Sequence, residues 1–157
     1  MIEIERKFLV VSDAYKAEAF NRIKIIQGFL NTDPERTVRV RIKGDKGFLT
    51  IKGKSSNDGL ERFEWETEIS KAVAENLLKL CEPGIIDKIR YEINVENHIF
   101  EVDEFFEDNQ GLVIAELELN SVDETFKKPN WLGEEVTGTA KYYNAQLSKS
   151  PYKTWKR

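Results

Sequence analysis

Apolar and charged residues alternate with a period of two through most of the chain. Residues 2–8 illustrate the pattern: one face carries apolar side chains, and the other carries Glu3, Glu5 and Lys7. A period of two is typical of β-strands, whose successive side chains point to opposite faces of a sheet. The pattern predicts eight strands, with the weakest alternation in the second: residues 2–8, 24–30, 37–43, 49–54, 62–69, 88–95, 100–103 and 113–119.

Turn sequences and short helical patterns fill the gaps between these strands. Residues 33–34, 44–47, 57–59 and 109–111 combine Gly, Asp, Asn or Pro in the manner of turns. Helices are predicted over residues 13–22, 71–81 and 139–149. The second follows Ser70 as N-cap and has the apolar face Val73, Leu77, Leu78 and Cys81. The fold class is therefore α+β with a mostly antiparallel sheet.

The charged faces of the strands indicate a closed sheet rather than an open one with a solvated face. A solvated sheet face usually mixes Thr, Ser and Gln with its charges, but here ionisable residues recur at alternate positions with almost nothing neutral between them. Eight strands can close into a barrel, which removes the exposed edges. If the apolar face packs outward against the helices, the charged face lines a lumen.

Composition supports a single folded domain, residues 1–157, and excludes several functions. Hydrophobic residues make up 40% of the 157 residues, enough for a core, and 24 basic against 28 acidic residues give a net charge of −4. A nucleic-acid binder would show a basic excess, so nucleic acid is an unexpected partner. One Cys and one His exclude the usual zinc sites and an internal disulfide.

Location follows from two further features of the sequence. The acidic N-terminal segment lacks the basic and apolar regions of a signal peptide, and no apolar stretch approaches the ~20 residues that span a bilayer. We therefore expect a cytoplasmic protein without membrane contact. The sequence is silent on oligomeric state, and a homodimer stays open.

A lumen lined by both signs of charge predicts its ligand. Buried charges are costly unless they meet opposite charges or ions. Lys and Arg suit phosphate oxygens, and paired carboxylates suit Mg²⁺ or Mn²⁺. The predicted ligand is therefore a polyanion with divalent cations. The cations that face the lumen are Lys7, Arg39, Arg41, Lys52, Lys54, Lys88 and Arg90, and the acids are Glu3, Glu5, Glu64, Glu66, Glu101, Asp103, Glu116 and Glu118.

These residues also carry a resemblance to a known family. The segment Glu3-Ile4-Glu5-Arg6-Lys7 has the ExExK form that marks the CYTH family, the triphosphate tunnel metalloenzymes. The later pairs follow in the family's order: Arg39-x-Arg41, Lys52-x-Lys54, Glu64-x-Glu66, Lys88-x-Arg90, Asp103 and Glu116-x-Glu118. The resemblance implies an eight-stranded antiparallel β-barrel that forms a tunnel, with helices packed outside.

The resemblance further implies an enzyme that binds a triphosphate in the tunnel with Mg²⁺ or Mn²⁺. Short bacterial members similar to this chain are linked to hydrolysis of inorganic tripolyphosphate to pyrophosphate and phosphate. By resemblance, Lys7, Arg39, Arg41, Lys52, Lys54, Lys88 and Arg90 bind phosphate; Glu3, Glu5, Glu64, Asp103, Glu116 and Glu118 bind metal; Lys88 and Glu5 are catalytic.

Three alternatives stay open at this point. Other members of the family hydrolyse thiamine or nucleoside triphosphates, and some are class IV adenylyl cyclases. A polyphosphate-binding module without catalysis would keep the cations, but it would not need the carboxylates. The joint presence of Glu3, Glu5, Glu116 and Glu118 favours an enzyme.

One position departs from the family pattern. Members similar to this chain have Gly-Tyr-Leu near the second strand, and the tyrosine is a candidate for activating water together with a lysine. This chain has Gly28-Phe29-Leu30. Phe29 cannot donate a hydrogen bond or transfer a proton, so Lys88 alone or the metal would have to activate the water.

Overall fold

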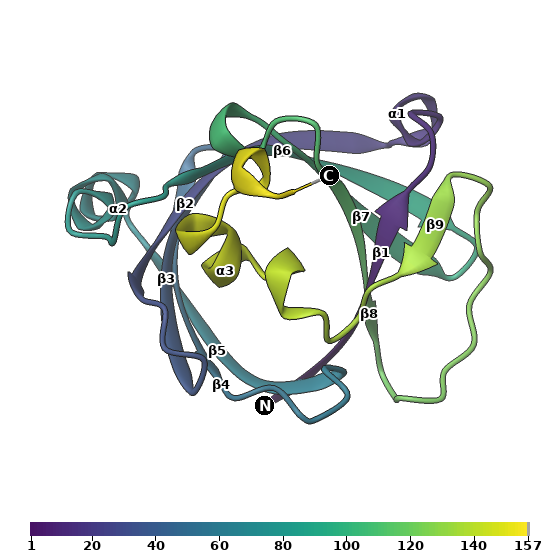
Figure 1. Ribbon diagram of the computed structural model, residues 1–157, viewed down its shortest axis with the longest axis horizontal. Helices are drawn as coiled ribbons and strands as arrows, with labels where there is room; N and C mark the ends of the chain where they lie inside the picture. The colour runs from purple at the N-terminus through teal and green to yellow at the C-terminus, as the bar shows by residue number, and fades with distance from the viewer. Residues whose placement is uncertain (157) are drawn as a thin grey trace.

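In the computed structural model, which describes residues 1–156, the chain forms a closed β-barrel (Figure 1). Each of the eight predicted strands is present, in the order β5-β4-β3-β2-β6-β7-β8-β1, and pairing between β5 and β1 closes the ring. Neighbouring strands in the ring are antiparallel. The strands are β1 (Ile2–Val10), β2 (Asn21–Asn31), β3 (Arg36–Lys43), β4 (Lys46–Gly53), β5 (Glu61–Ile69), β6 (Ile86–Val95), β7 (His98–Phe105) and β8 (Val113–Leu119).

A ninth strand, β9 (Leu132–Glu135), was not predicted from the sequence. It pairs with the second half of β1, beyond the point where β5 leaves that strand. Its four residues are too few for a recognisable alternation. Arg6 on the outer face of β1 forms a bidentate ion pair with Glu135 of β9, which fastens the added strand to the barrel.

The strand registers place the charged faces inside the barrel, as the alternation predicted. Lys7 lies opposite Glu116 across β1 and β8, and Lys52 lies opposite Glu64 across β4 and β5. The apolar faces point outward. They pack under α1 (Tyr15–Glu18) and the irregular segment before β9, in a cluster that includes Phe8, Tyr91, Phe100, Leu117 and Trp131.

The helix α2 (Lys71–Leu78) covers the outer face of β2, β3 and β4, with the predicted N-cap: the Ser70 hydroxyl accepts a hydrogen bond from the Val73 amide. Its predicted buried face was wrong in one respect. Val73 is 48% exposed, whereas Ala74 is fully buried. Ala74 packs on Gly47 of β4, where a Cβ would lie 2.8 Å from the alanine methyl group. The helix approaches the sheet through two small residues, a contact that apolar periodicity does not reveal.

The helix predicted over residues 13–22 was too long. Only Tyr15–Glu18 is helical, and β2 already begins at Asn21. Asn21 pairs in register with Glu92 of β6, and its side chain donates a hydrogen bond to the Glu92 carboxylate at 2.6 Å. Long-range pairing therefore overrides the local helical pattern at this end of β2.

The helices are not all outside the barrel. The 3₁₀ turn η2 (Ala140–Tyr142) and the helix α3 (Asn144–Lys149) lie across one end of it (Figure 1). Leu147 of α3 is buried against Phe29, Ile86, Phe105 and Ile114, which lie on the inner faces of their strands. The expectation of outer helices holds for α1 and α2, and the C-terminal segment instead plugs one mouth.

Two further 3₁₀ turns complete the described structure: η1 (Glu107–Asn109) after β7 and η3 (Tyr152–Thr154) near the C-terminus. The Asn109 side chain accepts a hydrogen bond from the Tyr152 amide, which joins the two turns beside the plugged mouth. Within residues 1–156, the helices are all too short and too polar to cross a membrane.

Candidate active site

A cavity of about 430 Å³ runs through the barrel interior. Of the residues predicted for the site, all but Asp103 line it: Glu3, Glu5, Lys7, Arg39, Arg41, Lys52, Lys54, Glu64, Lys88, Arg90, Glu116 and Glu118. Asp103 is 1% exposed and lies behind the wall of the cavity, where it holds two of the cations. The alternation along the strands thus brings together side chains that are distant in the sequence.

Two arginines of β3 keep guanidinium donors that no carboxylate of the described chain occupies. The Arg41 guanidinium is buried, and its Nε donates to the Gln27 side-chain oxygen at 3.0 Å rather than to a carboxylate. Burial, with the charges of Arg39 and Arg90 nearby, lowers the pKa of Arg41. Arg39 donates to Thr50 and Glu66 through Nη2, but its buried Nε has no partner among residues 1–156. Such underused guanidinium groups are suited to phosphate oxygens.

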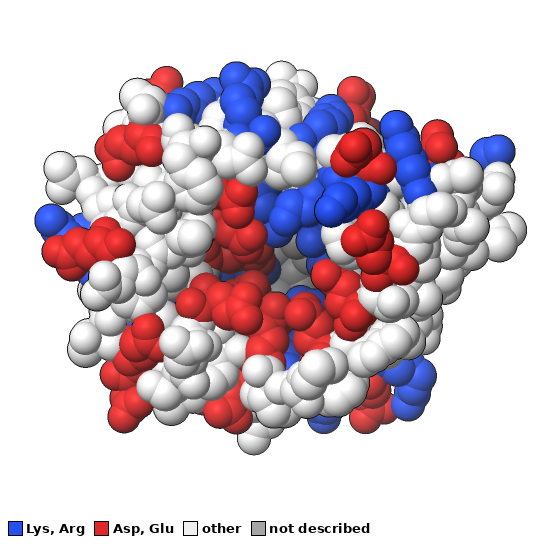
Figure 2. Space-filling model, turned by 180° about the vertical axis from the view of Figure 1, so that it is seen from behind, with Lys and Arg blue, Asp and Glu red and all other residues white. Residues whose placement is uncertain are grey.

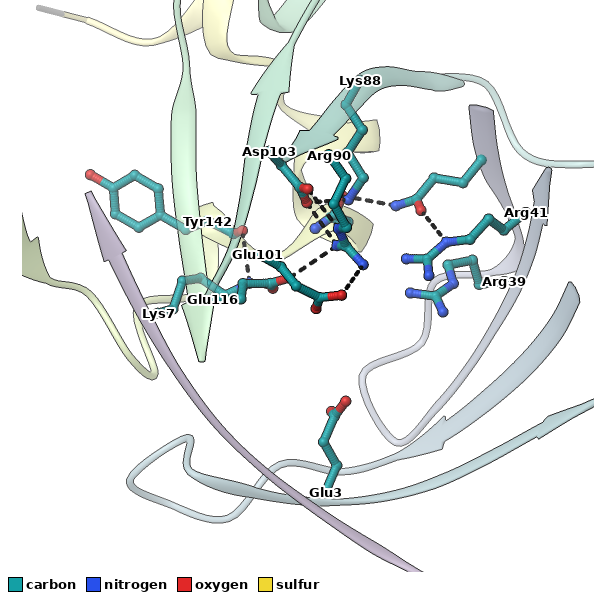
Figure 3. A network of polar contacts seen from close by, with 12 residues as sticks. Glu3, Lys7, Arg39, Arg41, Lys88, Arg90, Glu101, Asp103, Glu116 and Tyr142 are labelled. Carbon is teal, nitrogen blue, oxygen red and sulfur yellow. Dashed lines mark hydrogen bonds and ion pairs between the residues drawn. The ribbon is translucent and has the colours of Figure 1, made fainter. Parts of the chain in front are cut away.

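A buried ionic network occupies the wall formed by β6, β7 and β8 (Figure 3). Arg90 binds both carboxylate oxygens of Asp103, at 2.8 and 2.9 Å, and also reaches Glu116 at 3.2 Å. Lys88 donates to Asp103 at 2.7 Å, and Lys7 pairs with Glu116 at 3.0 Å. Both Asp103 oxygens are therefore taken by cations of the cavity wall.

Within this network, the pKa values of both Lys88 and Asp103 are lowered, with different consequences for their charges. Burial lowers the pKa of Lys88 to about 7, and the charges of Arg90 and Arg41 act in the same direction against the attraction of Asp103. Burial would raise the pKa of Asp103, but Arg90 and Lys88 outweigh it and hold the pKa at about 2. The carboxylate is therefore a fixed negative charge at neutral pH, whereas the lysine is close to losing its proton.

The remaining carboxylates lie on β1, β5 and β8. Lys52 bridges Glu3 at 3.0 Å and Glu64 at 3.3 Å. Glu5 has no cation or hydrogen-bond donor for its side chain among residues 1–156, and burial together with the charges of Glu116 and Glu3 raises its pKa well above the usual value. Burial, Glu3 and Glu64 also raise the pKa of Glu118. This part of the cavity holds an excess of negative charge.

Acidic and basic side chains also occupy different parts of the mouth opposite the C-terminal plug (Figure 2). Figure 2 looks into this mouth, where acidic side chains gather around the hollow and a smaller group of basic side chains lies on one side. Lys54 belongs to the other end: it follows β4, is exposed, and makes no ion pair within the described chain.

The donor set fits a hard divalent cation. Carboxylate oxygens are the ligands that Mg²⁺ and Mn²⁺ prefer, and crowded carboxylates with raised pKa values are stabilised by a positive ion between them. Within residues 1–156, no three acidic, Cys or His side chains lie close enough together to hold a metal ion on their own. Such an open arrangement suits Mg²⁺, which usually keeps waters and binds substrate phosphates.

Four residues of the site escaped the sequence analysis: Gln27, Thr50, Arg62 and Asn144. Gln27 and Thr50 lie on inner faces and bind Arg41 and Arg39, respectively. Arg62 faces the cavity and donates to the Thr37 hydroxyl at 3.1 Å. The strand alternation could have included these three. Asn144 is on the plug helix, and no pattern in the sequence places that helix in the barrel.

Phe29 lies on the inner face of β2 and contributes to the lining of the cavity. Most of its ring packs in the apolar cluster beneath α3, and it is only 5% exposed. Phe29 therefore packs against the plug helix and offers no polar group to a ligand.

A closed barrel with buried cations and carboxylates on its inner wall defines a tunnel protein for phosphate-rich ligands, and the comparisons with known proteins agree. The sequence pattern of the CYTH domain matches residues 1–150. The chain belongs to the CYTH family.

Curated relatives match along nearly the whole chain. An inorganic triphosphatase from Acetivibrio thermocellus is 48% identical over 155 residues, covering 98% of this chain and 97% of the relative. An inorganic triphosphatase from Nitrosomonas europaea is 34% identical over 154 residues, covering 96% and 99%. The crystal structure of the inorganic triphosphatase NE1496 is 32% identical, with a TM-score of 0.66 and 93% of each chain covered.

Proposed function

We propose that this protein is a divalent-metal-dependent inorganic triphosphatase that converts tripolyphosphate and water into pyrophosphate and phosphate. One observation carries the proposal. Within the described residues, the same cavity holds guanidinium groups that bind no carboxylate, such as Arg41, and carboxylates that bind no cation, such as Glu5. A linear polyphosphate with a divalent cation satisfies both sets. The two curated relatives, both inorganic triphosphatases, support the choice of substrate.

Phosphate binding is assigned to the cations on the inner wall. Arg39 and Arg41 present planar guanidinium groups that can donate hydrogen bonds to a phosphate. Arg90, whose nitrogens already donate to Asp103, Glu101 and Glu116, adds positive charge beside them. The lysines add point charges around the chain of phosphates: Lys7, Lys52, Lys54 at the rim, and Lys88. Phosphoryl transfer needs mainly positioning and charge neutralisation, which these residues supply.

The carboxylates that would hold the metal are Glu3, Glu5, Glu64, Glu116 and Glu118. A bound Mg²⁺ or Mn²⁺ neutralises phosphate charge and polarises the phosphoryl group. Asp103 was also predicted as a metal ligand, but we now assign it to positioning because Arg90 and Lys88 occupy both its oxygens.

The reaction forms a bond between a water oxygen and the terminal phosphorus, and it breaks the bridging P–O bond to release pyrophosphate. We assign to Lys88 the contact with the reacting phosphoryl group and its water. The ammonium is held on the cavity wall beside Arg90 and Arg41, the groups that bind the phosphates. Glu5, predicted as a second catalytic residue, faces the same cavity and forms no ion pair within residues 1–156. Its raised pKa makes it a stronger base than an ordinary carboxylate.

A panel of substrates tests the proposal. Phosphate release should be measured with tripolyphosphate, ATP, thiamine triphosphate and pyrophosphate, each with Mg²⁺ or Mn²⁺. We expect the highest kcat/KM with tripolyphosphate because cations and carboxylates face the cavity from most of its strands, and these groups bind phosphate and metal rather than a base or a thiazolium ring. Equal or faster turnover of ATP or thiamine triphosphate would favour those activities, and cyclic AMP would reveal a cyclase.

Binding of tripolyphosphate without turnover of any substrate would instead identify a polyphosphate-binding module. Association with a second copy of the chain and a place in the cytoplasm stay predictions from the sequence. Light scattering and cell fractionation test them.

A further inference from the structure

Asn144 links the plug helix to two cations of the cavity wall. Its Oδ1 accepts a hydrogen bond from Lys88 Nζ at 3.1 Å and a second one from Gln27 Nε2 at 2.8 Å. The Gln27 oxygen in turn accepts from Arg41 Nε at 3.0 Å. A chain of two amides therefore connects Arg41 on β3, through Gln27 on β2, to Lys88 on β6.

The polarity of this chain leaves one arrangement of the amides. Arg41 is only a donor, so it requires the oxygen of Gln27, and Gln27 must then direct its NH₂ group toward Asn144. Lys88 is also only a donor, and it requires the oxygen of Asn144. Both demands converge on Asn144 Oδ1, so no other orientation of either amide satisfies the two cations.

Lys88 needs this second contact to have a defined position. Its flexible four-carbon stem ends in a charge with three donors, and the ion pair with Asp103 fixes only one direction. Asn144 supplies another acceptor, from the plug rather than from the barrel wall. The Phe105 ring, whose centre lies 5.4 Å from Lys88 Nζ, offers no hydrogen-bond acceptor of comparable strength. Without Asn144, Asp103 would be the one polar acceptor holding the ammonium among the described residues.

We propose that Asn144 is a positioning residue for the hydrolysis of triphosphate, holding Lys88 directly and Arg41 through Gln27 in the places where they meet the phosphates. This inference rests on the proposed function. It gives the C-terminal helix a part in turnover beyond closing one mouth of the tunnel.

The structure separates this role from the anchoring of the helix. Leu147, one turn further along α3, is buried in the apolar cluster that seats the plug, whereas Asn144 is partly exposed to the cavity. Shortening Asn144 should therefore leave the helix seated. Gln146 provides a matched control because it is an amide on the same helix that also lines the cavity, and its side chain hydrogen-bonds to no residue in the described range 1–156.

The first experiment compares steady-state kinetics of Asn144→Ala, Asn144→Asp and Gln146→Ala with tripolyphosphate. We expect Asn144→Ala to lower kcat by roughly 10- to 100-fold, as for a displaced reacting group, with KM within about threefold of wild type. Asn144→Asp keeps the acceptor, so it should recover kcat to within about threefold of wild type, while its added negative charge raises KM. Gln146→Ala should match wild type.

The second experiment tests the link to Arg41 by a double-mutant cycle. Gln27→Leu should lower kcat, and the Gln27→Leu/Asn144→Ala double variant should lose little more than the worse single variant, because both changes break one chain. Thermal unfolding of each variant reports whether the fold is kept. If Gln27→Leu does not fold, the kinetics of Asn144→Ala still test the role of Asn144.

Three outcomes would overturn the inference: kcat of Asn144→Ala within twofold of wild type, an equal loss in Gln146→Ala, or no recovery in Asn144→Asp. Additive losses in the cycle would reject the link through Gln27. Failure of the proposed function is a separate result, since it would appear in the wild-type protein as no hydrolysis of tripolyphosphate.

Discussion

Glu5 of β1 lies directly opposite Glu118 of β8, and neither carboxylate forms an ion pair with any cation in the described chain. Like charges in directly opposed positions of a sheet are destabilising. A neighbouring pair on the same two strands, Lys7 and Glu116, is by contrast a salt bridge of 3.0 Å. Within the described chain, one inward register position of β1 and β8 therefore carries two carboxylates without a bound cation, whereas the next inward position carries an ion pair.

The first prediction concerns Glu5→Gln, which should stabilise the metal-free protein and abolish most of its activity. The neutral amide removes the desolvated charge and its repulsion with Glu116 and Glu3. We expect the melting temperature in EDTA to rise by about 2–4 °C, corresponding to about 1 kcal/mol in a chain of this size. Differential scanning calorimetry measures the shift, and phosphate release from tripolyphosphate measures the activity.

The same variant has a predictable dependence on pH. Burial and the charges of Glu116 and Glu3 raise the pKa of Glu5 in the folded state, so the folded protein binds this proton more tightly than the unfolded chain. The stability contributed by the protonated carboxyl is lost as pH rises from the ordinary value of 4.5 through the raised pKa. The advantage of Glu5→Gln should therefore grow with pH over that range, and a constant or shrinking advantage would contradict the account.

The second prediction is that Glu116→Gln has the opposite effect on stability. Glu116 is 8% exposed and pairs with Lys7 and Arg90, whose charges hold its pKa well below the usual value against the effect of burial. Removing one partner of a buried ion pair costs about 3–5 kcal/mol, and the amide oxygen keeps part of the hydrogen bonding. We expect the melting temperature to fall by about 5 °C or more in EDTA.

Together these two variants form a matched pair. Both replace Glu by Gln on the inner wall, so they share the change in charge and volume. Equal shifts in the same direction would show that the local partners of the two carboxylates do not govern stability. Both variants should lose activity if both carboxylates serve the site.

The barrel could be predicted from the sequence because the pattern that defines each strand lies within that strand. Each strand shows its inner and outer faces through alternation, so the inward placement of Arg39, Lys52 and Glu64 required only the period of two. Family order then assigned phosphate and metal roles to them, which the proposed experiments test. Nothing in the geometry of a single strand distinguishes Glu5, without a partner, from Glu116, with two.

The unpredicted parts depend on contacts between distant segments. The plug needs Leu147 to meet Phe29 and Phe105, more than 40 residues away in the chain, and periodicity carries no such pairing. Asn144 gains its place only through that docking. The other two errors also come from contacts between distant segments. Pairing of β2 with β6 shortens α1, and the contact with Gly47 determines that Ala74 is buried.

The third prediction concerns removal of the metal. Activity should vanish in EDTA and return with Mg²⁺ or Mn²⁺. A cation that binds only the folded state stabilises it by RT ln(1 + [L]/Kd), about 2.7 kcal/mol at 100 times Kd. Wild-type protein should therefore melt at a higher temperature with Mg²⁺ than with EDTA, and Glu118→Gln should reduce this difference.

The control for the third prediction is Glu135→Gln, since Glu135 is bound to Arg6 on the outer face, away from the cavity. It should keep the Mg²⁺-dependent increase in melting temperature. A full increase in Glu118→Gln would remove Glu118 from the set of metal ligands, and no increase in the wild-type protein would argue against the metal site as a whole.

The last prediction separates two functions of Lys88. Its Nζ lies between Asp103 and Asn144 in a position for one small ammonium group, 1% exposed. Burial lowers its pKa to about 7, whereas an arginine at this position would stay protonated. If Lys88 moves a proton or must occupy this narrow position, Lys88→Arg should lose activity almost as completely as Lys88→Met, by about 100-fold or more in kcat.

If Lys88 only holds phosphate, Lys88→Arg should instead keep kcat within about tenfold while Lys88→Met raises KM, since arginine binds phosphate at least as well as lysine. Single-turnover measurements with saturating tripolyphosphate distinguish the two results, because they report the chemical step without product release. We expect the first result, since both acceptors of the ammonium, Asp103 and Asn144, are held by further partners. A larger guanidinium group at this buried position would have to displace one of them.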